Sequence, residues 1–289
     1  MRTLLVFLAV CCLAMPVRAE DYPVKNLLIE PAAALYNFTQ RPLVILDVRG
    51  ADAYAAGHVP GAVRVDGNEW SKNFQDGKDK DAWAVRLGKL GLTPEASVVI
   101  YDDASNKDAA RVWWILKYWG LNDVKLLHGM WTGWKAAKLP ISTEVPEVKP
   151  TVFPLLAQSN RLATKKDVVE SLAAKSAGIV DARTEAEYTG KNKLTNKFGG
   201  CMPGAKNLDW EQLIDTKTKR FKTPAELSEL FAKAKIDLTQ PQIAHCQGGG
   251  RSSVMDFAME LMGAKNVRNY HASWGEWGNS DDVPIEGKR

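Results

Sequence analysis

The sequence contains little cysteine, little histidine and little excess charge of either sign. Four cysteines and four histidines occur in 289 residues, and no pair among them has the spacing of a zinc site. We therefore expect no metal and no other cofactor. The formal net charge is +4, without a basic stripe of the kind that binds phosphate backbones. Nucleic acid is accordingly not expected as a partner.

Long apolar runs are also scarce, with one exception at the N-terminus. Arg2 is followed by an apolar run at residues 4–15 and by a small-residue cleavage pattern that ends at Ala19. This arrangement predicts a signal peptide, residues 1–19, that is cut before Glu20. The run is short for a membrane anchor, and no later segment approaches transmembrane length. The mature chain is thus expected to be secreted, in the periplasm, with no membrane anchor.

Cleavage at that point would leave two cysteines. Cys11 and Cys12 would be removed, so that Cys201 and Cys246 remain in an oxidising compartment. They could form at most one disulfide, but Cys246 lies in a loop suited to reactivity, which favours a free thiol. Cleavage would also remove two of the 38 basic residues and none of the 34 acidic ones, which lowers the net charge from +4 to +2. A buried N-terminal helix and lipid attachment at Cys11 fit the segment less well.

The most extensive feature of the sequence is an internal repeat. Residues 44–66 match residues 178–209, where the second copy carries a nine-residue insertion rich in Lys and Asn. Residues 97–134 match residues 241–277 in the same order. In each copy short apolar runs alternate with amphipathic helical patterns, which is typical of a parallel sheet covered by helices on both faces. The sequence therefore predicts an α/β fold with two tandem domains.

The expected elements and boundaries follow from this repeat. Apolar strands are predicted at residues 43–46 and 98–101, and helices at residues 109–118 and 254–262, each helix closed by a glycine near its C-terminus. Prolines between residues 140 and 154 predict an extended linker. We expect a first domain at residues 20–140, a Pro-rich linker at 141–158 and a second domain at 159–289.

The segment QIAHCQGGGRSS, residues 242–253, carries the strongest chemical signal. Cys246 ends an apolar strand-like run, three glycines follow it, and Arg251 stands five positions after the cysteine at the start of a predicted helix. The glycines let successive backbone N–H groups turn inward, and a helix N-terminus adds partial positive charge. Such a loop stabilises a thiolate and can hold an anion. We therefore predict that Cys246 is an activated nucleophile.

Spaced motifs in both copies resemble those of tandem-domain rhodaneses. Together they extend from about residue 27 to residue 285, which is nearly the whole mature chain. The matching segments are Asp47-Val-Arg49, Asp181-Ala-Arg183, residues 57–62, residues 110–114, the loop at Cys246 and residues 273–277.

The resemblance implies two rhodanese-like domains, each a parallel sheet flanked by helices, and a sulfurtransferase activity. In this family a sulfane sulfur moves from a donor such as thiosulfate or 3-mercaptopyruvate to cyanide or a thiol through a cysteine persulfide. Here the persulfide would form on Cys246. The first domain would lack a catalytic cysteine, with Asp102 or Asp103 in the place of Cys246. The implied partners are a small anionic sulfur donor, a thiol or cyanide acceptor, and a sulfur-accepting protein.

Further site residues are expected around Cys246. Arg251 either contacts the anionic end of the donor or pairs with a carboxylate beneath the site. Arg183 corresponds to the donor-binding arginine of the family, unless it forms a salt bridge with a carboxylate such as Glu187. Trp274 resembles an aromatic residue that lines the family's pocket, or packs in the core. The loop residues expected to bind substrate are Gln247, Gly248, Gly249, Gly250 and Ser252.

Other polar residues near these motifs are expected to be structural. His245 precedes the nucleophile, but adjacent residues of a strand point to opposite faces, so a packed histidine is favoured over a Cys-His pair. Cys201 occupies the position that His58 has in the first copy, and a small buried cysteine is favoured there over a resolving or sensor thiol. Asp47 and Asp181 are expected to have structural roles in their own domains.

Two alternatives to a sulfurtransferase with a small donor stay open. A rhodanese-fold phosphatase would account for His-Cys and Gly-x-Gly-Arg-Ser, but such enzymes place the arginine one position further from the cysteine so that the loop encircles a phosphate. A persulfide carrier with little turnover of small donors is the second alternative. The residues after Cys246 lack both the basic side chains of thiosulfate-type loops and the Cys-Gly-Ser-Gly pattern of mercaptopyruvate-type loops. The sequence therefore leaves the donor open.

Overall fold

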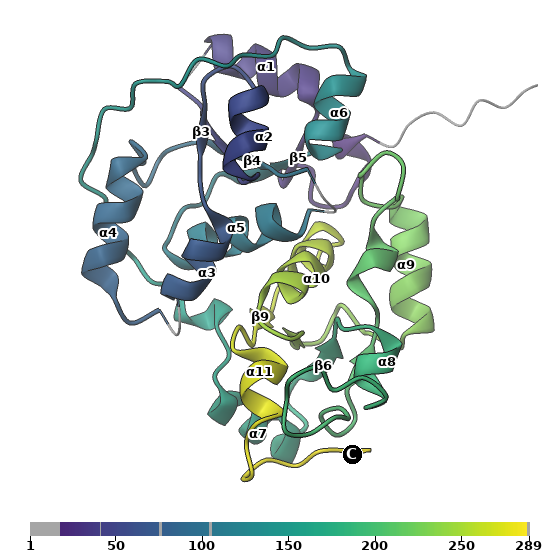
Figure 1. The fold of residues 1–289 in the computed structure, drawn as a ribbon. Helices are drawn as coiled ribbons and strands as arrows, with labels where there is room; N and C mark the ends of the chain where they lie inside the picture. The colour runs from purple at the N-terminus through teal and green to yellow at the C-terminus, as the bar shows by residue number, and fades with distance from the viewer. Residues whose placement is uncertain (1–17, 41, 75–76, 104–105, 288–289) are drawn as a thin grey trace, which may run out of the picture.

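The computed structural model describes residues 18–40, 42–74, 77–103 and 106–287. Apart from Arg18 and Ala19, the predicted signal peptide lies outside these residues. Within the described ranges, no helix combines the length and the apolar character needed to cross a membrane. The chain forms two α/β units, coloured purple to teal and teal to yellow in Figure 1.

The first unit is built on a parallel sheet. Its strands are β1 (Leu28–Ile29), β2 (Val44–Asp47), β3 (Ala62–Arg64), β4 (Val98–Tyr101) and β5 (Val124–Leu127). Their order in the sheet is β1-β5-β4-β2-β3, and every neighbouring pair is parallel. The apolar runs VILD and VVIY form β2 and β4, two of the three inner strands, because strands covered by helices on both faces bury most of their side chains.

The second unit repeats this plan with one strand fewer. Its strands are β6 (Gly178–Asp181), β7 (Lys206–Asn207), β8 (Gln242–His245) and β9 (Val267–Asn269). Their order is β7-β6-β8-β9, again with parallel pairing throughout. The register pairs Asp181 with His245, so the carboxyl ends of β6 and β8 meet at one edge, where Cys246 follows. The prediction of two parallel sheets is confirmed.

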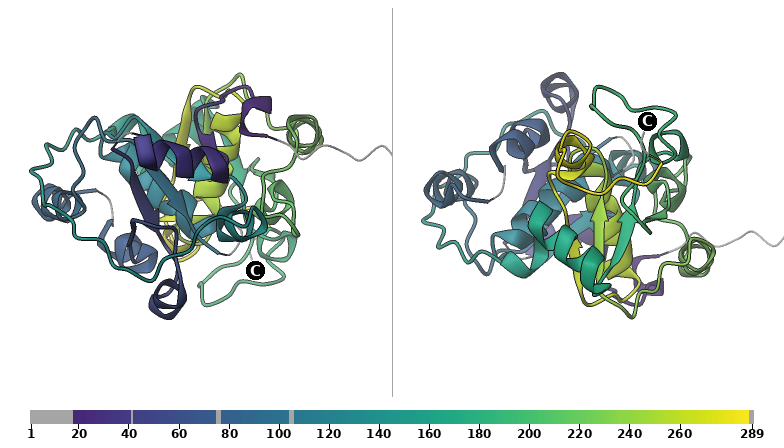
Figure 2. Two further views of the ribbon diagram at one scale, coloured as in Figure 1. Left: turned by 90° about the horizontal axis from the view of Figure 1, so that it is seen from above. Right: turned by 90° about the horizontal axis from the view of Figure 1, so that it is seen from below.

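Helices flank both sheets (Figure 2). In the first unit they are α1 (Pro31–Gln40), α2 (Ala51–Ala56), α3 (Gly67–Phe74), α4 (Lys80–Lys89), α5 (Lys107–Tyr118) and α6 (Met130–Ala136). In the second unit they are α7 (Lys165–Ala174), α8 (Glu185–Tyr188), α9 (Pro224–Lys233), α10 (Gly250–Leu261) and α11 (Ser273–Trp277). Short 3₁₀ helices occur at η1 (Ala19–Asp21), η2 (Ser159–Arg161) and η3 (Trp210–Leu213).

Two of the predicted helices begin earlier than their apolar periodicity indicates. Helix α5 begins at Lys107 instead of residue 109, and α10 begins at Gly250 instead of residue 254. The first turn of α10 is Gly-Arg-Ser-Ser, which carries no apolar periodicity. Gly249 caps this helix in a left-handed conformation with a φ of 81°. The N-terminus of α10 therefore lies within the glycine loop itself, close to Cys246.

The two units share one hydrophobic core. Helices α5 and α10 lie side by side at the centre of Figure 1, and the largest hydrophobic cluster includes side chains of both. Trp113 of α5 meets Phe257 of α10 edge to face, with ring centroids 4.9 Å apart. Between α6 and η2 the linker forms no helix or strand and runs along the first unit, where Thr151 N–H donates to the Gly88 carbonyl at 2.9 Å. The packing of α5 against α10 thus joins the two units.

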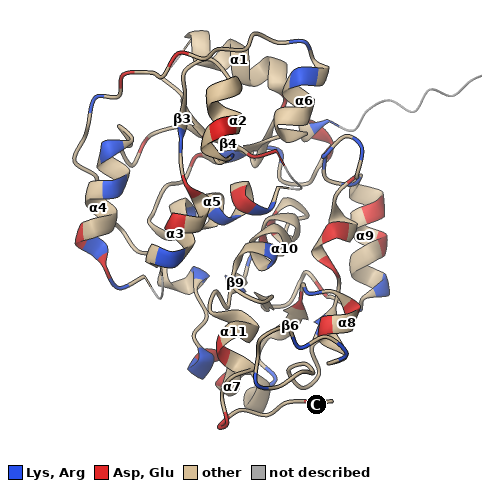
Figure 3. Ribbon diagram, viewed as in Figure 1, with Lys and Arg blue, Asp and Glu red and all other residues tan. Residues whose placement is uncertain are grey.

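Charge of both signs is spread over both units. Figure 3 shows Lys and Arg interspersed with Asp and Glu on helices such as α4 and α9. This distribution agrees with the small net charge of the sequence.

Candidate active site

The loop that follows β8 carries the candidate nucleophile. Cys246 is 1% exposed, and Gly248 is the exposed residue of the loop above it. A Cβ at Gly249 would collide with the ring of His271, so this position needs glycine for space as well as for its positive φ. No side chain covers the loop at Gly248, where an added Cβ would have nothing within 4 Å. The loop next to Cys246 is thus exposed at Gly248, although the cysteine itself is buried.

Ser273, the first residue of α11, anchors the loop from below. Its hydroxyl donates to the Tyr270 carbonyl at 2.7 Å, and its oxygen accepts the N–H groups of Cys246 at 3.0 Å and Gly249 at 3.4 Å. Ser273 adopts a left-handed φ of 58°, which is costly for a residue with a side chain. Met130, in the same place in the first unit, has a φ of 53°. Sequence reasoning missed this role, although both residues precede the Trp of the repeated motif.

The surroundings of Cys246 stabilise its thiolate. Burial opposes ionisation, but the charge of Arg251 and hydrogen bonds from Ser252 and the Gly248 N–H outweigh it and lower the pKa of the Cys246 thiol. The N-terminus of α10 acts in the same direction. The site thus favours the nucleophilic form of the cysteine.

Arg251 is held in place by a carboxylate of α8. Its Nη1 and Nη2 atoms each lie 2.7 Å from an oxygen of Glu187, in a two-pronged ion pair. Burial would raise the pKa of Glu187, yet Arg251 and Thr184 lower it, so the carboxylate stays ionised. Of the two predicted roles for Arg251, the structure shows the pairing with a carboxylate beside the site. That pairing keeps the guanidinium next to Cys246.

The first unit also reaches this loop. A Cβ at Gly250 would collide with the guanidinium of Arg111, which projects from α5. The Nε of Arg111 is buried without a hydrogen-bond partner among the described residues, and its Nη1 lies 3.4 Å from Asn68 Oδ1 and 3.5 Å from Asp108 Oδ1. Arg111 entered the sequence reasoning only within a motif, because its proximity to the loop depends on how the two units pack.

The comparisons with known proteins agree with this geometry. Residues 31–137 and 164–280 match the rhodanese-like domain family. The chain belongs to the rhodanese family. It is 36% identical over 250 residues to the thiosulfate sulfurtransferase of Corynebacterium glutamicum, with 81% of each chain covered. It is 31% identical over 275 residues to that of Azotobacter vinelandii, with 92% of this chain and 99% of the relative covered.

A solved structure supports the fold of this rhodanese. SseA from Escherichia coli, described as a 3-mercaptopyruvate sulfotransferase, superposes with a TM-score of 0.74 at 24% identity, over 86% of this chain and 99% of SseA. Together with the curated relatives, the two matched domains identify the chain as a sulfurtransferase. The phosphatase alternative gains no support from them.

Arg183 forms a buried ion pair within the second rhodanese unit. Its side chain is 1% exposed, its Nη2 lies 2.6 Å from Asp181 Oδ2, and it also donates to the Gly200 carbonyl at 2.8 Å. In the first unit Arg49 pairs in the same way with Asp47 at 2.6 Å. Because the unit without the cysteine has this pair too, its role is structural. Of the two predicted roles, the structure shows a salt bridge with a carboxylate, which is Asp181 and not Glu187. A contact of Arg183 with the donor stays a prediction.

Trp274 is part of the core of the rhodanese unit. It is fully buried, its ring lies 4.1 Å from the Arg183 guanidinium carbon, and its Nε1 donates to the Phe198 carbonyl at 3.1 Å. Of the two predicted roles, core packing is the one observed, and a contact with the donor stays a prediction. Its proximity to the loop is indirect, through the N–H that it donates to the Cys246 carbonyl at 2.9 Å.

Gln247 is fixed by the insertion that distinguishes the second repeat. Its Nε2 donates to Asn196 Oδ1 at 2.9 Å, and Asn196 Nδ2 donates back to Gln247 Oε1 at 3.1 Å. Asn196 lies in the inserted segment between residues 190 and 200, whose function the sequence did not indicate. The inserted segment therefore packs against the catalytic loop at Gln247.

In the first unit an aspartate stands where the second unit has its cysteine. Asp102 follows β4 as Cys246 follows β8, which identifies Asp102 rather than Asp103 as the counterpart of the cysteine. Its carboxylate accepts N–H groups of Asn106, Asp108 and Ala109 at 3.0–3.2 Å. Burial nevertheless raises the pKa of Asp102 to about 7. A carboxyl group fills this loop, and it provides no sulfur nucleophile.

His245 and Cys201 occupy structural positions. His245 is fully buried on the strand before the nucleophile, and burial lowers its pKa to about 4, so it is neutral at pH 7. Cys201 forms an isolated bridge with Glu286 as His58 does with Ser142, and burial raises the pKa of its thiol. Both Cys201 and Cys246 are free. These observations favour the packed histidine and the buried structural cysteine.

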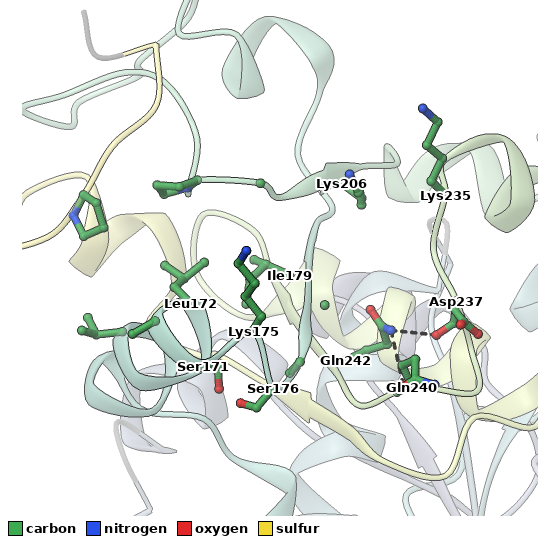
Figure 4. A pocket seen from close by; sticks show the side chains of 17 residues that line it. Ser171, Leu172, Lys175, Ser176, Ile179, Lys206, Lys235, Asp237, Gln240 and Gln242 are labelled. Carbon is green, nitrogen blue, oxygen red and sulfur yellow. Dashed lines mark hydrogen bonds between the residues drawn. The ribbon is translucent and has the colours of Figure 1, made fainter.

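A cavity of about 810 Å³ lies away from the catalytic loop. Its walls include Lys175, Lys206, Lys235 and the side chains of Leu172 and Ile179 (Figure 4). It also touches the first residues of β6, β7 and β8, whereas Cys246 follows the last residue of β8. Parallel strands run from one edge of the sheet to the other, so this cavity is at the edge opposite to Cys246. It takes no part in the chemistry of the thiolate.

Proposed function

We propose that this sulfurtransferase takes a sulfane sulfur from a small anionic donor, with thiosulfate or 3-mercaptopyruvate as the donor class, and passes it to a thiol or to cyanide. The single observation that supports this most is the position of Cys246 between the end of β8 and the N-terminus of α10, beside the Arg251–Glu187 ion pair. The names of the relatives, thiosulfate sulfurtransferase, point to the same donors. Thiosulfate is the donor to test first, because its negative charge suits a loop that has Arg251 and Arg111 beside it.

The reaction has two balanced steps. The Cys246 thiolate attacks the outer sulfur of thiosulfate, a Cys–S–S bond forms, and sulfite leaves with the electron pair of the broken S–S bond. The acceptor, cyanide or a thiolate, then attacks the outer sulfur of the persulfide. Thiocyanate or a new persulfide is released, and the Cys246 thiolate is restored. No net oxidant or reductant is required.

The loop supplies electrostatic stabilisation in both steps. In this proposal the backbone N–H groups from Gln247 to Ser253 stabilise the thiolate and the outer sulfur of the persulfide, and Gly248, Gly249 and Gly250 leave room for the donor. Arg251 sets the potential at the sulfur and contacts the anionic end of the donor. Gln247, fixed by Asn196, borders the donor on one side.

Intact-mass analysis tests this function directly. The mature protein exposed to thiosulfate should gain one sulfur, and cyanide should remove it. Cys246→Ser should abolish the added mass and the transfer while the thermal unfolding temperature stays nearly unchanged, and Cys201→Ser should retain both. Phosphate release from p-nitrophenyl phosphate without persulfide would contradict the proposal. Sulfur uptake from a protein persulfide alone would favour the carrier function.

We also propose that the enzyme is exported to the periplasm and works with a sulfur-accepting protein there. The support is the pattern of residues 1–19, in which a basic start and a short apolar run precede Ala19. N-terminal sequencing of the protein recovered from its cells should give Glu20 as the first residue. An N-terminus at Met1 in the cytoplasmic fraction would contradict export.

A further inference from the structure

A buried chain of polar side chains lies beneath the catalytic loop and has no role in the steps above. Ser252, Ser253 and Asn269 are fully buried, and Asp256 is 1% exposed. Three of these residues belong to α10, and Asn269 ends β9. Buried polar side chains usually stabilise a fold less than well-packed apolar side chains would. The hydrogen bonds of this cluster instead hold the backbone of the catalytic loop.

The two serines hold the backbone of the loop. The hydroxyls of Ser252 and Ser253 donate to the Gly249 carbonyl at 3.0 and 2.7 Å, and this carbonyl also accepts the Ser253 N–H at 3.0 Å. The Gly249 carbonyl is thereby directed toward α10. The backbone N–H groups that stabilise the Cys246 thiolate are those of Gly248 and Ser252, on either side of this carbonyl.

Asn269 connects this arrangement to Asp256. Its Oδ1 lies 3.0 Å from the Ser252 hydroxyl, and its Nδ2 donates to Asp256 Oδ2 at 2.7 Å and to Ser253 Oγ at 3.3 Å. The carboxyl oxygen of Asp256 accepts a hydrogen bond and therefore pairs with the NH₂ group of the Asn269 amide. The oxygen of that amide is then the end that faces Ser252. The Ser252 hydroxyl has one proton, which the Gly249 carbonyl and Asn269 Oδ1 share, so this contact holds the side chain of the residue whose backbone N–H stabilises the Cys246 thiolate.

We propose that Asp256 and Asn269 are positioning residues of the sulfur-transfer site, which fix the Ser252 hydroxyl and the Gly249 carbonyl so that the loop directs its hydrogen bonds at the Cys246 thiolate and persulfide. This role rests on the proposed function of Cys246. Neither residue touches the donor.

Burial and the nearby Glu260 raise the pKa of Asp256 well above its usual value, while Arg161 and Asn269 act in the opposite direction. The Oδ1 of Asp256 has no hydrogen-bond partner among the described residues. A neutral amide of the same shape could replace it.

The experiment measures the pKa of the Cys246 thiol from the pH dependence of its alkylation by iodoacetamide, together with persulfide formation from thiosulfate. Asp256→Asn keeps the shape of the side chain and an oxygen that can accept from Asn269, so both should stay within about threefold of the wild type. Asp256→Val and Asn269→Ser remove the contacts that hold the backbone of the loop, so that its N–H groups no longer converge on the sulfur, and each should raise the thiol pKa by about one unit and slow persulfide formation about tenfold at pH 7.

Ser171→Ala is the matched control. Ser171 is a buried hydroxyl of the same unit that accepts a hydrogen bond from Arg268 of β9 at 3.4 Å, away from the loop. It should lower the unfolding temperature without moving the alkylation profile. If Asp256→Val fails to fold, Asn269→Ser, which retains a polar side chain, carries the test.

Three results would count against the positioning role or against the proposed function, and they can be told apart. A wild-type alkylation profile in Asn269→Ser or in folded Asp256→Val would overturn the positioning role. A shift in Asp256→Asn as large as in Asp256→Val would also overturn it, since the carboxyl group would then act through its charge. Failure of the wild-type protein to form a persulfide would refute the proposed function, while the alkylation profiles would still report on the geometry of the loop.

Discussion

At the scale of single residues, the chemistry of Cys246 depends on its charged neighbours more than on its exposure. The thiol is buried, which alone would keep it protonated, and Arg251 reverses that tendency. Glu187 in turn prevents Arg251 from turning away. The Arg251–Glu187 ion pair beside the loop thus raises the fraction of Cys246 that is present as thiolate.

Replacement of Arg251 by Gln should change the pH dependence of sulfur transfer. Without the guanidinium, burial dominates and the thiol pKa rises, so we expect persulfide formation at pH 7 to fall about tenfold or more. Because the thiolate returns at higher pH, the deficit should shrink as the pH is raised toward the new pKa. Stopped-flow measurement across the pH range tests this. A deficit that is constant with pH would contradict it.

Replacement of Arg183 by Met should instead affect stability. Asp181 would be left as an unpaired buried charge, which costs about 3–5 kcal/mol of unfolding free energy. Arg49→Met in the first unit should cost a similar amount, because Asp47 is buried in the same way. Urea unfolding of both variants gives the comparison. A stable Arg183→Met protein with a raised KM for thiosulfate would instead support the donor-binding role.

At the scale of elements, the active site is completed by the contact between α5 and α10. Gly250, the first residue of α10, has no unusual φ, so its need for glycine comes from the Arg111 side chain of α5. A cation beside the N-terminus of a helix is unfavourable unless an anion lies between them. The thiolate and the donor are anions at that place.

Gly250→Ala should therefore reduce activity through Arg111. The added methyl group collides with the guanidinium, and overpacking of about 1–3 kcal/mol at the site corresponds to a loss of about tenfold or more. The double variant Gly250→Ala with Arg111→Ala removes the collision. A double-mutant cycle on kcat/KM should show that the glycine substitution costs little once Arg111 is absent. Equal costs in both backgrounds would contradict the contact.

At the scale of the whole molecule, the two units form one core with a histidine at their junction. His271 of the second unit stacks on Trp114 of the first, with ring centroids 5.5 Å apart, and also contacts Phe74. Its ring lies against Gly249 in the catalytic loop. The packing of the units and the shape of the loop are thereby linked.

The stability that this junction contributes should decrease in acid. Burial, together with the charge of Arg111, lowers the pKa of His271 from 6.5 to about 3. The unfolded chain binds a proton here between these values and the folded chain does not, so stability should fall as the pH is lowered from 6.5 toward 3. His271→Phe should lose less unfolding temperature over this range than the wild type does. Parallel pH curves for the two proteins would refute this coupling.

Several features of the fold and of the site could be predicted before the structure. The repeat predicted two parallel sheets, because short apolar runs at regular spacing are a local property of the chain. The position of Cys246 between strand and helix followed from the same pattern. The roles of Arg183 and Trp274 stayed open in the sequence, since each can serve donor binding or structure and the choice depends on which groups lie nearby in space.

The amino-acid sequence by itself determined the duplicated α/β plan and the glycine loop after Cys246, because hydrophobic periodicity and glycine act over a few residues. The tertiary structure decided the ion pairs: Arg251 with Glu187, and Arg183 with Asp181. It also brought Arg111 to Gly250 and Asn269 beneath Ser252. Such partners are far apart in the chain, and electrostatic and steric contacts depend on distance in space, which only the packed fold determines.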